Sequence, residues 1–281
     1  TSVVQLAART PTATAMAAIT LDHISNGRFQ LGLGVSGPQV VEGWYGRPSD
    51  KPLARTREYV EIVRKVVARD EPVEFEGQHY TLPYPGGTGL GKPLKSTLHP
   101  LRTEIPIYLY GEGPKNVAMP AEIADGWLPI FFAPKDNGFY RAALDEGFAR
   151  PGARHTIDDF EVPATVITVP IDDVEQAADM VRPFLALYIG GMGARDQNFH
   201  FEVFSRMGYE GDCVKIQDAY LDGRKDEAIA AVPTSMVEDI SLIGSVDKIR
   251  DELQLWEESV VTTLLLSGPP ELLELMADLV G

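Results

Sequence analysis

Three glycine-rich stretches have the residue types that hold phosphates. The first, GGTGLGKP, places Gly86, Gly91 and Lys92 in the register of a Walker loop. Such a loop needs a strand before it, a helix after it, and a Ser or Thr behind the lysine to bind magnesium. Pro93 stands at that hydroxyl position, and neither a strand nor a helix start adjoins the stretch. We therefore predict an exposed loop near the mouth of the fold, where Lys92 meets an anionic ligand.

The second stretch, LGLGVSG at residues 31–37, follows an apolar run typical of a strand and has the G-x-G-x-x-G spacing of a dinucleotide-binding loop. Parallel α/β folds place their sites at the carboxyl ends of strands. The residues expected to approach a ligand there are Gly34, Val35, Ser36 and Gly37. Pro38 and the GWYG run behind it do not predict the clean helix of a Rossmann unit.

The third stretch, YGEGPKN, also follows a predicted strand. A proline at the first helical position starts a helix whose free amides attract phosphate, and the lysine after it adds positive charge. The same pattern is equally typical of a plain strand-to-helix turn. The candidate ligand-binding residues are Tyr110, Gly111, Glu112, Gly113, Pro114 and Lys115.

The residue patterns required for a disulfide, a metal site or a hydrolase nucleophile are absent from the sequence. Cys213 is the only cysteine, which excludes a disulfide within the chain and predicts a buried structural thiol. No two of the five histidines have metal-ligand spacing, so we expect no metal site. Ser36 is not in a G-x-S-x-G elbow, so a hydrolase nucleophile is not visible. The residues themselves name no catalytic acid or base.

The overall charge limits the possible partners. With 41 acidic and 25 basic residues in 281, the net charge of -16 disfavours nucleic acids and anionic membranes. No apolar run reaches the roughly 18 residues of a membrane span, and no signal peptide is visible. We expect a cytoplasmic protein with a small-molecule substrate. The chain starts within a strand and without Met, so we also expect that an N-terminal piece is missing.

Strand and helix patterns alternate along most of the chain, which is typical of parallel βα units. An open doubly wound sheet and a closed (β/α)8 barrel both fit, and a barrel without its first one or two βα units explains a strand count below eight. We predict one domain, residues 1–281, with a helical insertion at about 189–232. The predicted strands are 2–6, 29–33, 105–110, 127–132, 162–169, 240–243 and 261–267, with a hairpin at 74–82. The predicted helices are 10–24, 52–69, 114–124, 139–148, 172–187, 246–258 and 271–280.

A family resemblance extends along essentially the whole chain. The stretch TSVVQLAARTPTATAMAAITLDHISNGRFQLGLGVSGPQVVEGWYG closely resembles the luciferase-like oxidoreductases, in particular the coenzyme F420-dependent branch of mycobacteria and other actinobacteria. YGEGPKNVAMPAEIADGWLPIFF, PFLALYIGGMGARDQNFH and VTTLLL continue the likeness. The resemblance implies a TIM barrel of the bacterial luciferase-like type with an insertion region, and a homodimer. It also implies that two βα units precede the segment equivalent to Thr1.

The resemblance assigns cofactor contacts to particular residues. Ser2 and Val3 match the position of a non-prolyl cis peptide that lies against the central ring of the deazaflavin. The segment from Gly34 to Gly37 matches residues that flank the ring and its tail, and the segment from Gly111 to Lys115 matches the phosphate end. In the relative that oxidises a sugar phosphate, a glutamate proton donor stands where this chain has Gly37, so that acid is not carried over.

The resemblance implies hydride transfer between C5 of the deazaflavin coenzyme F420 and an organic substrate such as a ketone, an alcohol or an activated alkene. The protein would supply orientation and keep one face of the ring open. Two alternatives remain. One is an FMN-dependent monooxygenase of the same superfamily, and the other is a non-catalytic or truncated barrel relative.

Overall fold

The computed structural model describes all 281 residues and divides into two compact units, which are described separately. No helix combines the length and the apolar composition that a membrane crossing requires. Unit 1 consists of Thr1–Gly111, Ala118–Trp127 and Glu146–Phe160. Unit 2 consists of Glu112–Val117, Leu128–Asp145 and Glu161–Gly281.

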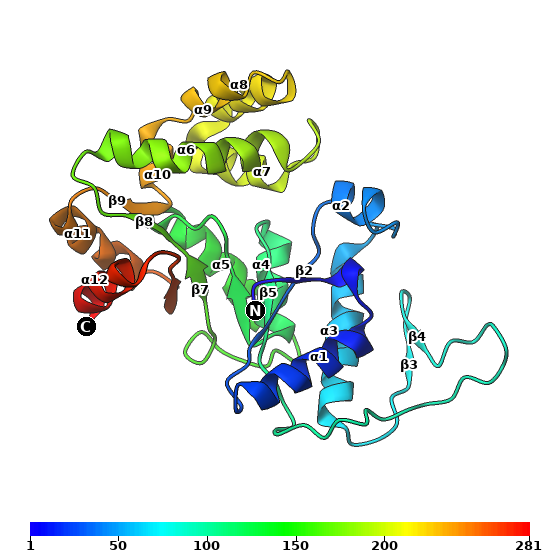
Figure 1. Ribbon diagram of the computed structural model, residues 1–281. Helices are drawn as coiled ribbons and strands as arrows, with labels where there is room; N and C mark the ends of the chain where they lie inside the picture. Colours follow the sequence, from blue (N-terminus) through cyan, green and yellow to red (C-terminus); the bar gives the residue numbers. More distant parts are fainter. The chain divides into compact units, whose positions relative to one another are not determined.

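The first part of the chain builds a parallel sheet covered by helices (Figure 1). Its strand order is β1-β2-β5-β6, and the pairs β1–β2 and β2–β5 are parallel. The elements are β1 (Val4–Gln5), η1 (Leu6–Ala8), α1 (Pro11–Ile24), β2 (Leu31–Gly34), α2 (Pro38–Gly43), α3 (Pro52–Ala68), β3 (Phe75–Glu76), β4 (Thr81–Leu82), β5 (Ile107–Tyr110), α4 (Pro114–Ile123) and β6 (Gly126–Leu128). The predicted strands and helices of this region exist, and most of their bounds shift by one to four residues.

Local signals explain where α1 begins and ends. The Thr10 hydroxyl accepts a hydrogen bond from Ala13 N at 3.3 Å, as an N-cap residue does. After the helix, Asn26 and Gly27 adopt the left-handed conformation, with φ of 54° and 78°. Both signals were read from the sequence, and both are confirmed.

The core of unit 1 lies between the sheet and the helices α1 and α3. Leu31 and Leu33 of β2 are fully buried, as are Ile62 and Val63 of α3. The predicted amphipathic pattern of α3 therefore does face a core.

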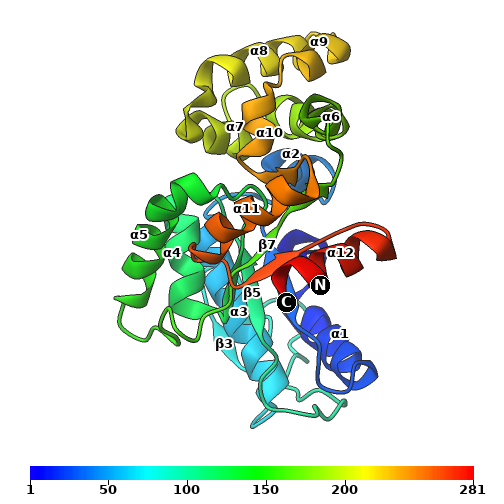
Figure 2. The same ribbon diagram turned by 90° about the vertical axis from the view of Figure 1, so that its left-hand side faces the viewer.

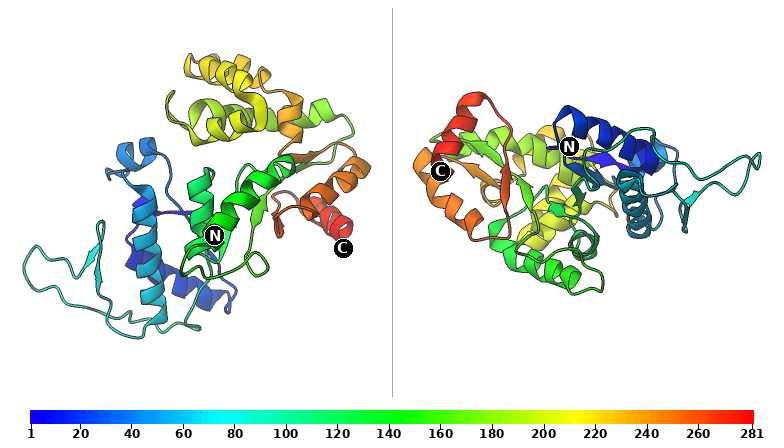
Figure 3. Two further views of the ribbon diagram at one scale, coloured as in Figure 1. Left: turned by 180° about the vertical axis from the view of Figure 1, so that it is seen from behind. Right: turned by 90° about the horizontal axis from the view of Figure 1, so that it is seen from below.

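A hairpin and a long loop lead from α3 to β5. β3 and β4 pair antiparallel, as predicted, with Phe75 opposite Leu82. The Glu58 carboxylate of α3 accepts hydrogen bonds from the backbone amides at positions 78, 79 and 80, at 2.8, 2.8 and 3.0 Å. This contact, the Glu58 clamp, ties the hairpin turn to the helix. The following segment, 84–92, is exposed and extends away from α3 (Figure 3).

A half-buried carboxylate joins β5 to the segment after α5. Asp125 accepts hydrogen bonds from Ile107 N at 2.8 Å and from Arg64 at 2.9 Å. His155 Nε2 lies 3.0 Å from its other oxygen, and His155 Nδ1 lies 2.9 Å from Asp159. Burial alone would lower the pKa of His155, but its hydrogen bonds to the two carboxylates raise that pKa above its usual value.

This network predicts a pH-dependent stability. Because the folded state raises the pKa of His155, its contribution is fully present below the unfolded pKa of about 6.5 and is lost as the pH rises through the folded pKa. The variant His155→Gln is expected to lower the melting temperature more at about pH 5.5 than at about pH 8.5. Calorimetry of both proteins at the two pH values measures this. An equal loss at both would contradict the assigned cause.

Unit 2 combines short parallel strand pairs with helices. Its elements, together with α5, which ends in unit 1, are η2 (Pro134–Asp136), α5 (Asn137–Phe148), β7 (Pro163–Thr165), β8 (Ile167–Val169), α6 (Val174–Gly191), α7 (Phe199–Phe204), η3 (Ser205–Tyr209), α8 (Glu210–Leu221), α9 (Lys225–Ala230), α10 (Thr234–Glu238), β9 (Ser241–Ile243), α11 (Val246–Glu257), β10 (Thr263–Leu265) and α12 (Pro270–Val280). The single strand predicted at 162–169 is two strands, because β7 pairs with β10 while β8 pairs with β9.

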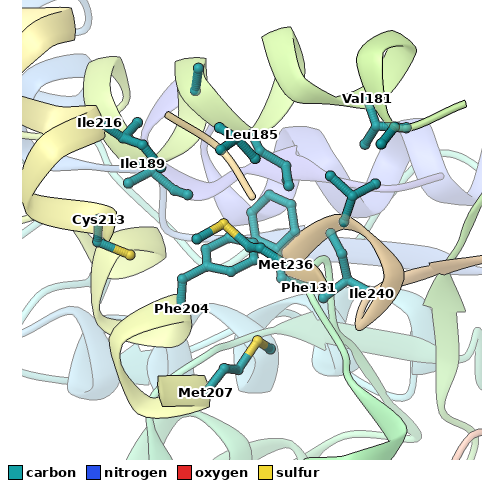
Figure 4. Packing of buried hydrophobic residues seen from close by; sticks show 14 of the residues in the cluster. Phe131, Val181, Leu185, Ile189, Phe204, Met207, Cys213, Ile216, Met236 and Ile240 are labelled. Atoms are coloured by element: carbon teal, nitrogen blue, oxygen red, sulfur yellow. The ribbon is translucent and has the colours of Figure 1, made fainter. Parts of the chain in front are cut away.

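The predicted helical insertion, residues 189–232, contains the helices α7, α8 and α9, and α10 follows it. They gather with α6 into one group of helices in the views of Figure 1 and Figure 2. Their shared core includes Phe131, Leu185, Phe204 and Met236, whose side chains converge in Figure 4. Cys213 is completely buried in this core, and burial raises the pKa of its thiol to about 12. The structural thiol is confirmed.

Candidate functional site

Three predicted site residues of unit 1 lie together at neighbouring strands. The peptide bond between Ser2 and Val3 is cis, as the family resemblance predicts. A Cβ added at Gly34, the last residue of β2, would lie 3.0 Å from Val3 Cγ2 and 3.5 Å from the Cβ of Tyr110, the last residue of β5. Because Gly34 has no side chain, the half-exposed side chain of Val3 can pack directly against its backbone.

The turn after β2 presents backbone groups at the same strand end. Ser36 has a left-handed φ of 64°, and Gly37 occupies the N-cap position of α2. The sequence predicted no clean helix after this turn, and that prediction is wrong for Pro38–Gly43, which form the six-residue α2. Pro38 at the first helical position explains the helix, since its missing N–H costs nothing there. Val35 and Ser36 are half-buried.

The turn after β5 holds a carboxylate whose partner the sequence did not reveal. Trp127 Nε1 donates to the Gly111 carbonyl at 2.7 Å within unit 1. The next residue, Glu112, is only 6% exposed, and its Oε1 lies 2.9 Å from His200 Nδ1. Its Oε2 is buried and has no hydrogen-bond partner. Arg206 donates to the Glu112 carbonyl oxygen at 3.2 Å. The three residues Glu112, His200 and Arg206 all belong to unit 2 and are called the Glu112 cluster.

Aromatic rings surround the histidine of the Glu112 cluster. The His200 ring packs edge-to-face against Phe131 and Tyr188, with centroid distances of 5.4 and 4.7 Å. Burial, and secondarily the charge of Glu112, raises the pKa of Tyr188. Asn198 caps α7 by accepting hydrogen bonds from His200 N and Phe201 N. In the sequence, His200 stands out only as one of five histidines without metal-ligand spacing, and the Asn198 cap is the one local signal that places it on a helix.

The start of α4 has the features predicted for an anion site. Pro114 is its first residue, and Val117 N donates to the Gly113 carbonyl at 2.9 Å. Lys115 is exposed and has no carboxylate within ion-pair distance. The contact of these residues with a cofactor stays a prediction.

The structure corrects the placement of GGTGLGKP. Lys92 lines a cavity of about 870 Å³ together with Ile105 and Ile107, next to the start of β5. Gly111 follows the other end of that strand. The prediction that Lys92 lies near the mouth of the fold is therefore wrong, because the mouth is at the carboxyl ends of the strands. The prediction of an exposed loop is confirmed, since residues 84–92 are all exposed.

Known proteins resemble this chain along most of its length. The family model of the luciferase-like monooxygenases matches residues 1–263. A Mycobacterium tuberculosis protein named "Putative coenzyme F420-dependent oxidoreductase Rv3520c" is 56% identical over 270 residues, which cover 95% of this chain and 78% of that protein.

Two solved structures share the fold. The coenzyme F420-dependent tetrahydromethanopterin reductase from Methanopyrus kandleri matches with a TM-score of 0.74 and 25% identity over 96% of this chain and 76% of that one. An F420-dependent secondary alcohol dehydrogenase in complex with an F420–acetone adduct has a TM-score of 0.66 and 16% identity, over 95% and 71% of the chains. The fold is that of the luciferase-like TIM barrels, as predicted, rather than an open doubly wound sheet. The chain therefore belongs to the luciferase-like monooxygenase family.

Proposed function

We propose that this protein is a coenzyme F420-dependent oxidoreductase that acts on an organic substrate such as a ketone, an alcohol or an activated alkene. The observation that carries the proposal is the close approach of Val3 and Tyr110 to Gly34, the last residue of β2, where the missing side chain leaves room beside an apolar, partly exposed Val3. The 56% identity with a protein named for F420 supports the choice of cofactor.

The residues of this chain fit such a cofactor. The Val3 side chain is apolar and 37% exposed, which suits the face of a flat ring. The backbone from Gly34 to Gly37 can approach a ligand closely, because two of its four residues lack a side chain. Lys115 lies in the first turn of α4, where an anionic tail would be favoured. When bound, F420 would supply a carbon centre that exchanges hydride, and the chain would orient it and cover one ring face.

Ligand binding tests this proposal directly. The purified protein is expected to quench the fluorescence of F420 on binding and to bind FMN much more weakly. Gly34→Ala is expected to weaken F420 binding about tenfold, or about 1.4 kcal/mol, because the new Cβ would press on Val3 Cγ2. Gly43→Ala is the matched control, since nothing lies within 4 Å of its added Cβ. Tight FMN binding without F420 binding would refute the cofactor assignment.

We also propose that the protein acts as one barrel domain and as a homodimer in the cytoplasm. A lone, buried Cys213 suits a reducing compartment. The homodimer follows the usual state of the family, and light scattering of the purified protein measures it.

A further inference from the structure

We propose that the outer face of α1 is the surface through which two copies of this chain pair. The outer face is the side of the helix opposite its buried residues, and the 3.6-residue repeat brings Ala13, Met16, Ala17, Thr20 and Ile24 together on it. The inference rests on the homodimer proposed above and adds the surface that forms it. It does not depend on the cofactor or on the reaction.

α1 is unusual because neither of its two sides is charged. Its inner side packs into the core of unit 1 through residues such as Ala15, Ala18 and Ile19. The only Asp, Glu, Lys or Arg among its 14 residues is Asp22, which is buried and paired with Arg102 at 2.8 Å. A helix without a charged side is typically covered all round in the working protein.

A single chain leaves the outer face of α1 open to solvent, on the outside of unit 1 (Figure 2). Ile24 is 77% exposed and Met16 is 39% exposed. Single exposed apolar residues are common, but here they share one helix face with small uncharged residues. The composition of α1 therefore calls for a partner that the single chain does not supply.

The neighbouring helix α3 shows what a solvated side looks like in the same unit. α3 buries Ile62 and Val63, and it carries Arg57, Glu61 and Lys65 away from them. Glu61 and Lys65 form an ion pair at 3.2 Å along the helix surface. The two helices cover the same core, so the missing charges of α1 are a property of its outer face.

A short segment after the long loop enlarges this face. The His99 carbonyl lies 2.7 Å from His23 Nε2, and Arg102 is bonded to Asp22. These contacts hold residues 99–102 beside the last turn of α1. Leu101, which is 51% exposed, thereby adds apolar surface near the end of α1.

Charge favours a second copy of the chain as the occupant. Each copy has a net charge of -16, so two copies repel one another unless they meet through an uncharged surface. The outer face of α1 requires no ion to lose its water on contact. Its small side chains also let two helices pack at close range, and a two-fold axis would place the same face on both copies.

A pair of charge variants at Thr20 tests this arrangement. Thr20 is exposed on the outer face, and its hydroxyl bonds only to the Met16 carbonyl of its own helix. Thr20→Glu and Thr20→Lys each bring like charges together across a two-fold axis. We expect each variant to raise the dissociation constant of the dimer at least about 30-fold. An equimolar mixture of the two is expected to form a heterodimer, because the opposite charges then face each other.

Light scattering after size exclusion measures these states, and native mass spectrometry separates the heterodimer from the two homodimers. Ala142→Glu and Ala142→Lys are the matched controls, on an exposed position of α5 between Arg141 and Asp145. They are expected to leave the dimer unchanged. Ala13→Glu and Ala13→Lys repeat the pair at the other end of the face, so a folding failure at one position does not decide the outcome.

Three results would overturn the inference. They are a monomeric wild-type protein, a dimer that both Thr20 variants leave intact, and charge variants that dissociate singly but form no heterodimer when mixed. Fluorescence quenching by F420 is measured separately on the same samples. Absence of F420 binding would remove the proposed function and leave this surface as argued.

Discussion

Replacing Gly147 with alanine is expected to lower the free energy of unfolding by about 3 kcal/mol. Gly147 lies near the end of α5, and a Cβ there would overlap the Ala118 carbonyl oxygen of α4 and lie 2.6 Å from Ala121 Cβ. A backbone carbonyl cannot rotate away as a flexible side chain can, so the two helices must separate. The loss of packing then exceeds the helix propensity that alanine gains over glycine.

The same helix provides the control. Nothing lies within 4 Å of a Cβ added at Gly138, so Gly138→Ala is expected to leave stability unchanged or raised by up to about 1 kcal/mol. Urea unfolding of both variants and the wild-type protein measures the difference. Equal stability of the two variants would show that α4 and α5 do not approach as closely as described.

Replacing Arg102 with methionine is expected to cost about 3 kcal/mol, because it leaves a buried carboxylate without its cation. Asp22 is only 1% exposed. Its two oxygens lie 2.8 and 3.1 Å from Nη2 and Nε of Arg102, and Phe29 N donates to it at 3.3 Å. After the substitution, the one remaining hydrogen bond cannot replace the lost ion pair.

The cause of this loss can be isolated. If the unpaired charge destabilises the variant, the double variant Asp22→Asn with Arg102→Met should be more stable than Arg102→Met alone. Arg224→Met removes exposed ion pairs to Asp222 and Glu227 and is expected to cost at most about 1 kcal/mol. Urea unfolding of these variants decides between the charge effect and a general loss of contacts.

Much of the fold could be predicted because its signals are local. The N-cap at Thr10 and the left-handed stop at Asn26 and Gly27 lie beside the helix they bound. The alternation of such helices with apolar strands was enough to predict parallel βα units, and the low strand count and the family resemblance favoured a barrel over an open sheet. The division of residues 162–169 into β7 and β8 was not predictable, because it depends on two different partners from distant parts of the chain.

In the candidate site as well, some features could be predicted from the sequence, whereas contacts between distant positions could not. Gly34 and the cis bond after Ser2 were predicted, although the second followed from a family resemblance rather than from the residues alone. The Glu112–His200 contact joins positions 88 residues apart, and no local pattern announces it. Lys92 was misplaced for a related reason, since the spacing of a loop does not reveal which end of a strand it lies beside.

The Glu58 clamp allows the surface loop after the hairpin to change in length without disturbing the elements that the loop connects. Its three amide contacts hold the hairpin turn on α3, and Val73 pairs with Leu94 behind the loop. Residues 84–92 are exposed between these two fixed points. Members of a lineage could gain or lose residues there without consequence for α3 or β5, and the same stretch is the natural place for a genetically inserted label.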